Sequence, residues 1–297
     1  MKFSLKKINL YLKLIRITSW LKNIFVFVPL VFSKHLFDYD YLSKVIVAFI
    51  TFSFASSLVY IFNDLMDIPR DRIHPIKKNR PLAADLITAS EAKFILIIFS
   101  LITLLLCFFI RNEFVAVILV YILINIFYSI RWKNLVIIDV FCISAGFMLR
   151  VIGGGLIISV YISNWLILTT LFLSLFLAIM KRRVEFVSYQ KINEQREVLD
   201  KYSLNFIDQM VSITASGVVI SYALYTVSAR AVLEFGTEKL IYTTIFVLFG
   251  IFRYMYLAFK ENKGENIIDL LLKDKPMIFN LILYIIFTLS IIYLKYD

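Results

Sequence analysis

Three aspartates and one asparagine between two apolar segments have the clearest chemical potential in this sequence. They are Asn63, Asp64, Asp67 and Asp71. Residues three and four apart share one face of a helix, so these side chains are predicted to project together. Carboxylates this close repel one another unless a cation lies among them. Such oxygen ligands suit Mg²⁺, which combines one or two carboxylates with substrate phosphates. The alternative is a solvated helix end that carries acids.

Pro69 lies inside this acidic segment and complicates the helical interpretation. Proline removes a helical hydrogen-bond donor and kinks or ends the helix. Asp71 is therefore expected either on the face shared by Asp64 and Asp67 or in a turn beyond it.

Basic residues follow the acidic segment within about ten positions. They include Lys77, Lys78 and Arg80, with Arg72 closer to the acids. A metal that bridges some phosphate oxygens, together with cations that neutralise the rest, suits a polyphosphate ligand. The alternative is the ordinary positive charge of a cytoplasmic loop in a membrane protein.

A second, shorter loop also carries polar side chains. Tyr128 and Lys133 precede an apolar segment that contains Asp139, Arg150 and the glycines 153–155. An arginine near the middle of a membrane must face the bundle interior or a wet cavity. Eleven helical residues span about 16 Å, so Asp139 and Arg150 are not direct partners. The glycines allow either close packing or a break in the helix, and pairing of Arg150 with a carbonyl or carboxylate of another helix is the structural alternative.

A third loop begins with adjacent cations at the end of an apolar segment. Its polar residues are Lys181, Arg182, Arg183, Glu185 and, further along, Tyr202. Such cations are common as topological anchors, and Glu185 lies one helical turn from Lys181, where the two can pair. Charged residues thus gather toward one side of the predicted membrane, as expected for one cavity that opens inward.

The composition predicts an all-α integral membrane protein. Of 297 residues, 61% are hydrophobic and 28 are phenylalanine, far more than a soluble core needs. About nine apolar segments are long enough to span a bilayer, which predicts one transmembrane bundle. Their approximate bounds are 17–33, 41–62, 92–111, 113–130, 136–160, 161–180, 205–229, 239–259 and 277–295.

The net charge of +11 is best interpreted as a topology signal. Lysine and arginine gather in alternate connections, which predicts a cytoplasmic N-terminus and active site and a C-terminus on the far side. Residues 1–16 alternate basic and apolar side chains, as in an amphipathic helix on an anionic membrane surface. No basic segment belongs to a soluble domain, so nucleic-acid binding is disfavoured, and a single domain over 1–297 is the simplest interpretation.

The chain resembles the UbiA-type intramembrane prenyltransferases through its acidic motif and its number of spans. In that superfamily the first acidic motif holds magnesium and a diphosphate, and a second acidic motif follows the sixth span. The corresponding loop here has Lys181-Arg182-Arg183-x-Glu185 in place of a second Asp-x-x-x-Asp.

This departure is similar to one branch, the polyprenyl-phosphate phosphoribosyltransferases. Further stretches carry the resemblance: Trp20-x-Lys22-Asn23, Asp71-Arg72-x-His74-Pro75, Tyr128-Ser129, Ala145-Gly146-Phe147-x-Leu149-Arg150, Asp208-Gln209, Gly250-Ile251-Phe252-Arg253-Tyr254 and Leu272-x-Asp274-x-Pro276.

The resemblance implies a Mg²⁺-dependent enzyme in the plasma (inner) membrane that moves 5-phosphoribose from phosphoribosyl pyrophosphate to a polyprenyl phosphate. It implies catalytic roles for Asp64, Asp67 and Asp71, which with Asn63 bind the metal. Substrate-binding roles fall to Lys22, Arg72, Lys77, Arg80, Tyr128, Lys133, Arg150, Lys181, Arg182, Arg183, Glu185 and Tyr202. A homo-oligomer is compatible with this interpretation. The alternatives are a prenyltransferase with a prenyl diphosphate donor and aromatic acceptor, and a transporter, which usually has internal repeats.

Overall fold

A computed structural model describes residues 2–74, 76–189, 199–260 and 273–294. All regular structure in these ranges is helical, which confirms the predicted all-α class. Pro75, from the sequence pattern above, and Leu272 lie outside the described residues. The described chain divides into two compact units, and each is treated separately below. The single domain expected from the sequence stays a prediction.

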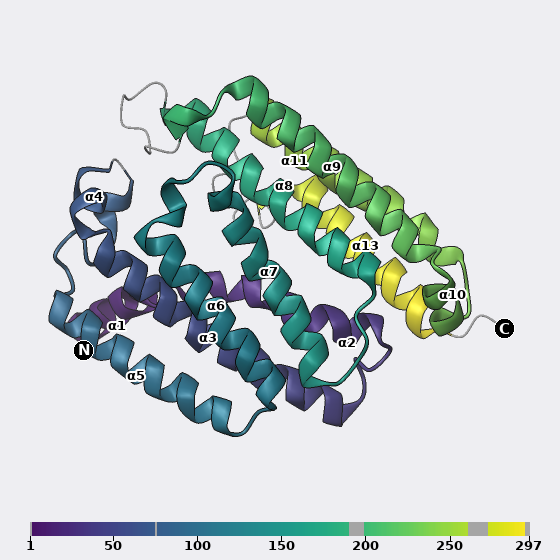
Figure 1. The fold of residues 1–297 in the computed structure, drawn as a ribbon, viewed down its shortest axis with the longest axis horizontal. Helices are drawn as coiled ribbons and strands as arrows, with labels where there is room; N and C mark the ends of the chain where they lie inside the picture. The colour runs from purple at the N-terminus through teal and green to yellow at the C-terminus, as the bar shows by residue number, and fades with distance from the viewer. Residues whose placement is uncertain (1, 75, 190–198, 261–272, 295–297) are drawn as a thin grey trace. The chain divides into compact units, whose positions relative to one another are not determined.

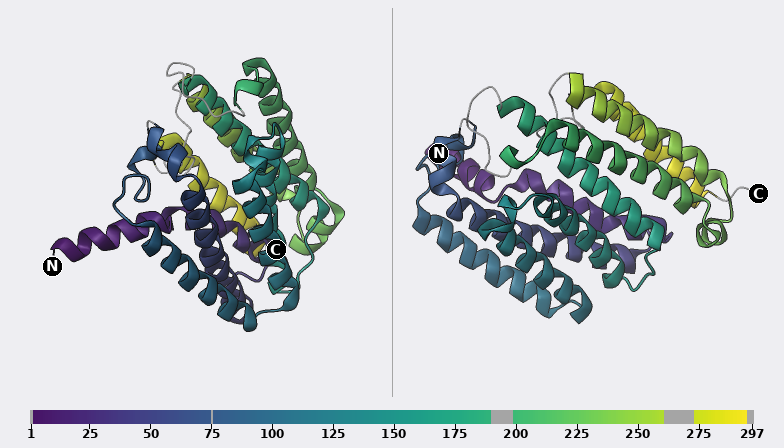
Figure 2. Two further views of the ribbon diagram at one scale, coloured as in Figure 1. Left: turned by 60° about the vertical axis from the view of Figure 1, so that its left-hand side comes forward. Right: turned by 45° about the horizontal axis from the view of Figure 1, so that its top comes forward.

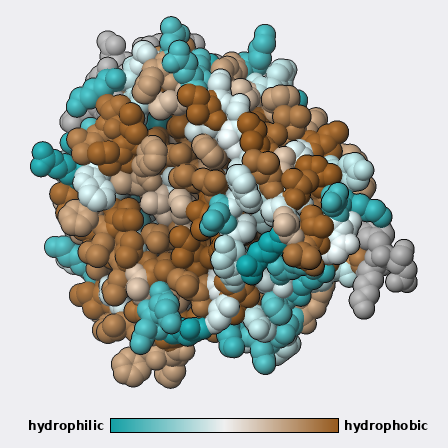
Figure 3. All heavy atoms as spheres, turned by 45° about the vertical axis from the view of Figure 1, so that its right-hand side comes forward, coloured by the Kyte–Doolittle hydropathy of each residue, from teal (hydrophilic) through white to brown (hydrophobic). Residues whose placement is uncertain are grey.

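Eight of the described helices are long and apolar enough to cross a membrane. A ninth span results if the N-terminal pair, Lys7–Leu14 and Ile17–Phe32, is counted as one span bent by 43°. The predicted number of about nine spans is therefore confirmed. Large apolar side chains remain exposed on these helices, and they gather over much of the face drawn in Figure 3, as expected for lipid-facing surfaces.

The first unit comprises the described residues of Met1–Leu30, Asp38–Lys133 and Leu149–Val160. Its long central helix (Tyr39–Met66) packs against the helices Ala89–Phe108 and Asn112–Ile130 and against the 3-10 helix Ile17–Phe27 (Figure 1). The elements are α1 (Lys2–Leu14), η1 (Ile17–Phe27), α2 (Val28–Phe32, shared with the second unit), α3 (Tyr39–Met66), α4 (Ile68–Ile73), η2 (Lys77–Asn79), α5 (Ala89–Phe108), α6 (Asn112–Ile130) and η3 (Trp132–Asn134, also shared).

The N-terminal helix α1 is attached to this unit by apolar and polar contacts. Leu14 is fully buried with Ile61 and neighbouring apolar residues. On α1, Lys7 forms an ion pair of 3.0 Å with Glu91, which also completes a capping box at the start of α5. A capping box satisfies helix-end N–H groups that otherwise lack partners. The Glu91 carboxylate therefore stabilises the first turn of α5 and also binds Lys7 of α1.

Gly154, near the end of α7 (Ile138–Ile157), permits a close approach between two segments of the first unit. A Cβ at this position would lie 2.0 Å from the backbone oxygen of Val26 in η1. Since α7 continues unbroken to Ile157, the glycines serve close packing, and a break in the helix does not occur there.

The second unit comprises the described residues of Val31–Phe37, Asn134–Met148 and Tyr161–Asp297. Its longest helices lie side by side in Figures 1 and 2, α8 with α9 and α11 with α13. The elements are α8 (Asn164–Tyr189), η4 (Leu199–Lys201), α9 (Leu204–Thr226), α10 (Ala229–Phe235), η5 (Lys239–Thr243), α11 (Thr244–Lys260) and α13 (Lys275–Tyr293). The first part of α7 belongs to this unit, and Phe176 and Met180 are fully buried in its core.

Candidate active site

The acidic segment lies where α3 ends and α4 begins. The helix stops at Met66, and α4 starts at Ile68 with Pro69 in its first turn. Proline is tolerated there because the N–H that it lacks would have no helical partner. The helix end expected from Pro69 is confirmed. Asp71 lies in the short helix α4, neither in the continuous helix nor in a turn.

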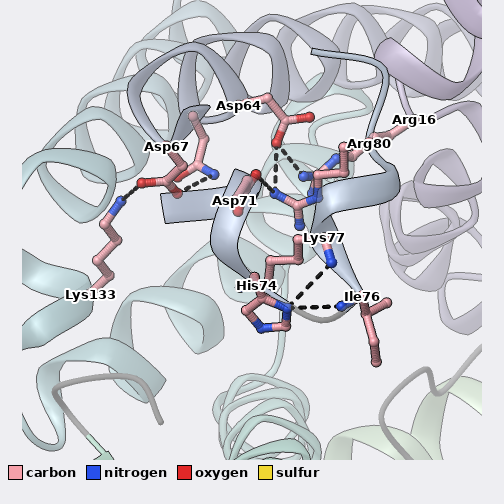
Figure 4. A network of polar contacts seen from close by, with 10 residues as sticks. Arg16, Asp64, Asp67, Asp71, His74, Ile76, Lys77, Arg80 and Lys133 are labelled. Carbon is pink, nitrogen blue, oxygen red and sulfur yellow. Dashed lines mark hydrogen bonds and ion pairs between the residues drawn. The ribbon is translucent and has the colours of Figure 1, made fainter. Parts of the chain in front are cut away.

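The four predicted metal ligands divide into two groups (Figure 4). Asn63 donates a hydrogen bond from Nδ2 to Asp67 Oδ2 at 3.1 Å. Asp64 and Asp71 instead share one guanidinium, that of Arg80, at 3.0 and 2.6 Å. The backbone N–H groups of Asp67 and Asp71 donate to the backbone oxygens of Asn63 and Asp67 at 3.0 and 2.8 Å, so i,i+4 hydrogen bonds continue from α3 into α4. The single face expected from the spacing stays a prediction.

Every carboxylate of this segment is paired with a cation. Besides Arg80, Arg16 NH2 lies 2.5 Å from Asp64 Oδ1, and Lys133 Nζ lies 2.5 Å from Asp67 Oδ1. We call these six residues the balanced cluster, because its three carboxylates face three cations: Arg16, Asp64, Asp67, Asp71, Arg80 and Lys133 (Figure 4).

The cations of the balanced cluster differ in exposure. The Asp64 side chain is only 4% exposed, whereas Arg16 and Arg80 are 24% and 26% exposed. Lys133 is buried with Asp67. The buried carboxylates therefore depend on their partners for neutralisation, while the two arginine side chains are partly exposed.

The chemistry of the balanced cluster fits a magnesium ion. Among the described residues, no group of three or more His, Cys, Asp or Glu side chains is arranged as a metal site. The carboxylate and amide oxygens of Asn63, Asp64, Asp67 and Asp71 are nevertheless the hard ligands that Mg²⁺ prefers. A metal at these residues would take oxygens that Arg16, Arg80 and Lys133 now contact.

Arg150 is buried in the first unit at some distance in sequence from all of these residues. Its Nε donates to Asn23 Oδ1 at 2.7 Å and its NH2 donates to Tyr121 OH at 3.1 Å. The guanidinium also lies over the rings of Tyr121 and Phe52. The structural alternative, a carbonyl partner on another helix, is therefore observed, with the amide of Asn23 in η1 as that partner.

The structure also describes the remaining predicted residues of the first unit. Arg72 pairs at the surface with Asp85 at 2.5 Å. The backbone N–H of Lys77 donates to His74 Nδ1 at 3.3 Å. Lys22 in η1 and Tyr128 in α6 are half-buried.

Arg16 and Asn23 are polar residues of the first unit to which the sequence patterns assigned no substrate contact. In the sequence, Arg16 is one of the basic residues of the amphipathic N-terminus, and Asn23 is the last residue of the pattern Trp20-x-Lys22-Asn23. The signal available for Arg16 was its position as the last cation before an apolar span.

In the second unit, Arg182 is the centre of a buried network. Its Nε lies 2.7 Å from Asp139 Oδ2, and its NH1 lies 2.5 Å from Glu185 Oε2. Lys181 Nζ lies 3.8 Å from the other oxygen of Glu185, which confirms the predicted pair. Tyr202 OH donates to Asp139 Oδ1 at 3.0 Å. We call the four buried residues Asp139, Arg182, Glu185 and Tyr202 the buried network.

The Tyr202 hydroxyl both donates and accepts a hydrogen bond. The backbone N–H of Ile137, a residue with a left-handed φ of 69°, donates to Tyr202 OH at 2.7 Å. Burial raises the pKa of the Tyr202 phenol to about 12. The phenol therefore stays protonated at neutral pH and remains a donor to Asp139.

Two further arginines of the second unit also pair with aspartates. Arg183 Nε lies 2.6 Å from Asp208 Oδ1, and its guanidinium stacks 3.5 Å from the centre of the Phe259 ring. Arg253 and Asp274 form a two-point contact at 3.1 and 2.8 Å. The three adjacent cations predicted to contact a substrate therefore all have protein partners in this structure.

Residues 24–272 match the UbiA prenyltransferase family. A decaprenyl-phosphate phosphoribosyltransferase of Corynebacterium glutamicum is 32% identical over 219 residues, which cover 72% of this chain and 66% of that protein. A protein of the same name from Mycolicibacterium smegmatis is 30% identical over 222 residues, which cover 73% of this chain and 70% of that protein.

The solved structures support the fold. A UbiA homologue from Archaeoglobus fulgidus bound to GPP and Mg²⁺ has a TM-score of 0.71 at 20% identity, with 95% of this chain and 99% of that chain covered. A digeranylgeranylglyceryl phosphate synthase has a TM-score of 0.66 at 22% identity, with coverage of 96% and 99%.

Proposed function

Because the chain belongs to the UbiA prenyltransferase family, we propose that it transfers 5-phosphoribose from phosphoribosyl pyrophosphate to a polyprenyl phosphate and releases pyrophosphate. Two relatives that are 30% or more identical over most of this chain carry the name decaprenyl-phosphate phosphoribosyltransferase. The observation that carries the proposal is the balanced cluster, in which carboxylates for a metal lie beside cations for phosphate oxygens.

The donor's chemistry agrees with the residue types of two segments of the sequence. Phosphoribosyl pyrophosphate has a diphosphate at one end and a 5-phosphate at the other. One acidic segment and one basic segment, Lys181-Arg182-Arg183-x-Glu185, suit that molecule better than two acidic segments. The acceptor phosphate is already an anion at pH 7, so the reaction needs no general base to create the nucleophile.

Within the balanced cluster, the proposed roles follow from charge. Asn63, Asp64, Asp67 and Asp71 would hold Mg²⁺, and Arg80 and Lys133 would bind pyrophosphate oxygens. The metal would supply positive charge that stabilises the leaving group as the ribose C1–O bond breaks. Arginine offers two parallel donors to a phosphate, while lysine acts as a compact charge.

The remaining site assignments are proposals on the same basis. Lys181, Arg182, Arg183, Glu185 and Tyr202 are assigned to recognition of the donor's phosphate and ribose, and Lys22, Arg72, Lys77, Tyr128 and Arg150 to weaker substrate contacts. For Arg150 and Arg182, burial against protein partners favours roles as positioning residues.

The protein is a multi-pass membrane protein, and we place it in the plasma (inner) membrane with its N-terminus and active site cytoplasmic. The acceptor's polyprenyl tail would remain largely in the bilayer, which already supplies most of the ~0.8 kcal/mol per buried methylene. The enzyme should therefore discriminate strongly for the phosphate head and weakly for tail length.

A single assay tests the reaction. Purified protein in lipid nanodiscs is given Mg²⁺, labelled phosphoribosyl pyrophosphate and a polyprenyl phosphate, and the lipid phase is analysed. Label in a lipid product is expected, with polyprenyl phosphates of different lengths used at similar rates and the free alcohol unused. An unlabelled lipid phase, together with consumption of a prenyl diphosphate supplied in parallel, would instead indicate a prenyltransferase.

A further inference from the structure

Arg16 occupies a specialised position in the first unit. It lies between α1 and η1, at the bend of the N-terminal span, with a left-handed φ of 52°. A non-glycine residue is uncommon in this conformation and is worth examining. The bend brings a side chain from the start of the chain to a carboxylate 48 residues away.

Three contacts attach this bend to one face of α3. Ser57 Oγ donates to the backbone oxygen of Ile15 at 2.8 Å, the Arg16 guanidinium lies 4.9 Å from the centre of the Tyr60 ring, and Arg16 NH2 reaches Asp64. Ser57, Tyr60 and Asp64 follow at intervals of three and four residues, so they share one helical face. Trp20 adds a hydrogen bond of 2.9 Å to Ser57 Oγ. The position of Arg16 is therefore set by the fold.

Two guanidiniums converge on one oxygen atom. Arg16 NH2 and Arg80 NH1 lie 2.5 and 3.0 Å from the same Asp64 Oδ1. Like charges this close repel each other. Arg80 also contacts a second carboxylate, that of Asp71. In the ion pairs described, Arg16 contacts only Asp64. Two converging guanidiniums on partly exposed side chains form an arrangement that suits the oxygens of a polyanion.

Resting on the proposed function, we infer that Arg16 is a further pyrophosphate-binding residue, and that Asp64 holds it until metal and pyrophosphate bind together. Asp64 cannot serve a metal and two guanidiniums equally well. When Asp64 exchanges Arg16 for the metal, the guanidinium loses its partner and becomes available to a phosphate oxygen.

The charge balance makes the two binding events cooperative. Metal alone would add positive charge beside Arg16, Arg80 and Lys133 after displacing them from their carboxylates. Pyrophosphate alone would place negative charge beside three carboxylates. Each ligand therefore reduces the charge repulsion that opposes binding of the other. Such coupling is reciprocal, and each ligand typically raises the affinity for the other by about 5- to 150-fold.

A purely structural role for Arg16 predicts a different outcome. If Arg16 only neutralises the buried Asp64, its removal frees that carboxylate for metal, and pyrophosphate binding through the metal stays equal or tightens. If Arg16 also binds pyrophosphate, its removal has opposite effects on the two ligands.

The test uses the full chain in nanodiscs and measures binding without catalysis. Binding of labelled inorganic pyrophosphate is measured by equilibrium dialysis with Mg²⁺, and binding of Mn²⁺ alone by its free-ion electron spin resonance signal. Arg16→Gln should weaken pyrophosphate binding about tenfold or more and should tighten Mn²⁺ binding. The matched control is Lys7→Gln, which also removes an N-terminal cation from an interhelical ion pair, and it should change neither value by more than about twofold.

A second variant decides the matter if Arg16→Gln does not fold. Asp64→Asn removes the charge that holds Arg16, so pyrophosphate binding in the presence of a chelator should tighten several-fold. Adding Arg16→Lys to this variant should reduce that gain, because the guanidinium fork is lost. Unchanged or tighter pyrophosphate binding in Arg16→Gln, or no metal-free gain in Asp64→Asn, would overturn the inference.

These measurements separate the inference from the proposed function. Dependence of pyrophosphate binding on Arg16 in a protein that transfers no phosphoribose would leave the inference standing for another diphosphate donor. If the protein transfers phosphoribose but binds pyrophosphate equally well without Arg16, the inference about Arg16 is wrong and the proposed function stands.

Discussion

The balanced cluster of the first unit and the buried network of the second use the same chemistry in different surroundings. Both pair arginine with aspartate at hydrogen-bonding distance. In the balanced cluster the side chains of Arg16 and Arg80 are about a quarter exposed, whereas in the buried network the Arg182 side chain is 3% exposed and that of Asp139 is fully buried. The first arrangement can exchange partners with solutes, and the second resists exchange.

The physical basis of this difference is desolvation. Removing one partner from a buried pair leaves an uncompensated charge and is strongly destabilising. Where one side of the pair still contacts water, solvent or an incoming anion can replace the lost partner. The arginines of the two regions are therefore predicted to differ when they are replaced: mainly loss of activity at Arg16 and Arg80, and mainly loss of stability at Arg182.

The largest expected effect is that of Asp67→Asn on transfer. The amide retains an acceptor for Lys133 but loses the charge that a metal needs, so the initial rate should fall about a thousandfold. The midpoint of thermal unfolding should also fall, because the buried Lys133 loses its charged partner. The control Asp85→Asn, at the exposed partner of Arg72, should retain activity. Near-normal turnover in Asp67→Asn, or turnover unaffected by a chelator, would contradict a metal role for this cluster.

Arg182→Met should have the largest effect on stability. It leaves the buried Asp139 without its arginine and should lower the free energy of unfolding by about 3–5 kcal/mol, measured by thermal or denaturant unfolding in detergent. Adding Asp139→Asn should restore part of the loss, because the unpaired charge is then removed. The partly exposed Arg80 provides the comparison, and an equal loss of stability in Arg80→Gln would erase the distinction between the regions.

Glycine substitutions test the packing of the two units. In the first unit, Gly154→Ala places Cβ 2.0 Å from a backbone oxygen, which cannot move aside, so it should cost at least the ~1–3 kcal/mol typical of overpacking. In the second unit, Gly217→Ala meets the ring of Phe172 at 2.4 Å, a side chain that can shift, and should cost less. Gly250→Ala, whose nearest neighbour is 3.5 Å away, is the control. Equal unfolding midpoints for all three would refute the close approach at Gly154.

The smallest effect concerns the Tyr202 phenol at high pH. Burial raises its folded-state pKa to about 12, from a reference of about 10. Because the folded pKa is the higher one, the stability contribution is complete below about pH 10 and is lost as the pH rises toward 12. Thermal unfolding measured from pH 8 to pH 12 should show this loss in the native chain and less of it in Tyr202→Phe. Identical profiles for the two proteins would mean that Tyr202 does not titrate in this range.

Local patterns predicted much of the fold. Apolar segments of membrane length predicted the spans, and Pro69 predicted the end of α3. The i,i+4 spacing of Lys181 and Glu185 predicted their contact. Each of these features depends on a few neighbouring residues, which is why a single sequence contains the information.

The candidate site was less predictable because its contacts join distant segments. The spacing of the aspartates predicted that they project together, but it could not show that Asp67 contacts Lys133 while Asp64 and Asp71 share Arg80. An arginine inside a span needs a polar partner, so the sequence predicts that Arg150 has one. The spacing cannot identify that partner, because Asn23 is 127 residues away.

By itself, the sequence determined the class of the protein, the approximate spans and the residue types available for phosphate and metal chemistry, because hydrophobic length and local spacing express themselves within one helix. Only the tertiary structure decided which cation meets which carboxylate. The pairing of Arg16 with Asp64 and of Arg182 with Asp139 depends on how separate helices pack. The partly exposed Arg16 can exchange its carboxylate for another anion, whereas the buried Arg182 cannot do so without leaving an unpaired buried charge.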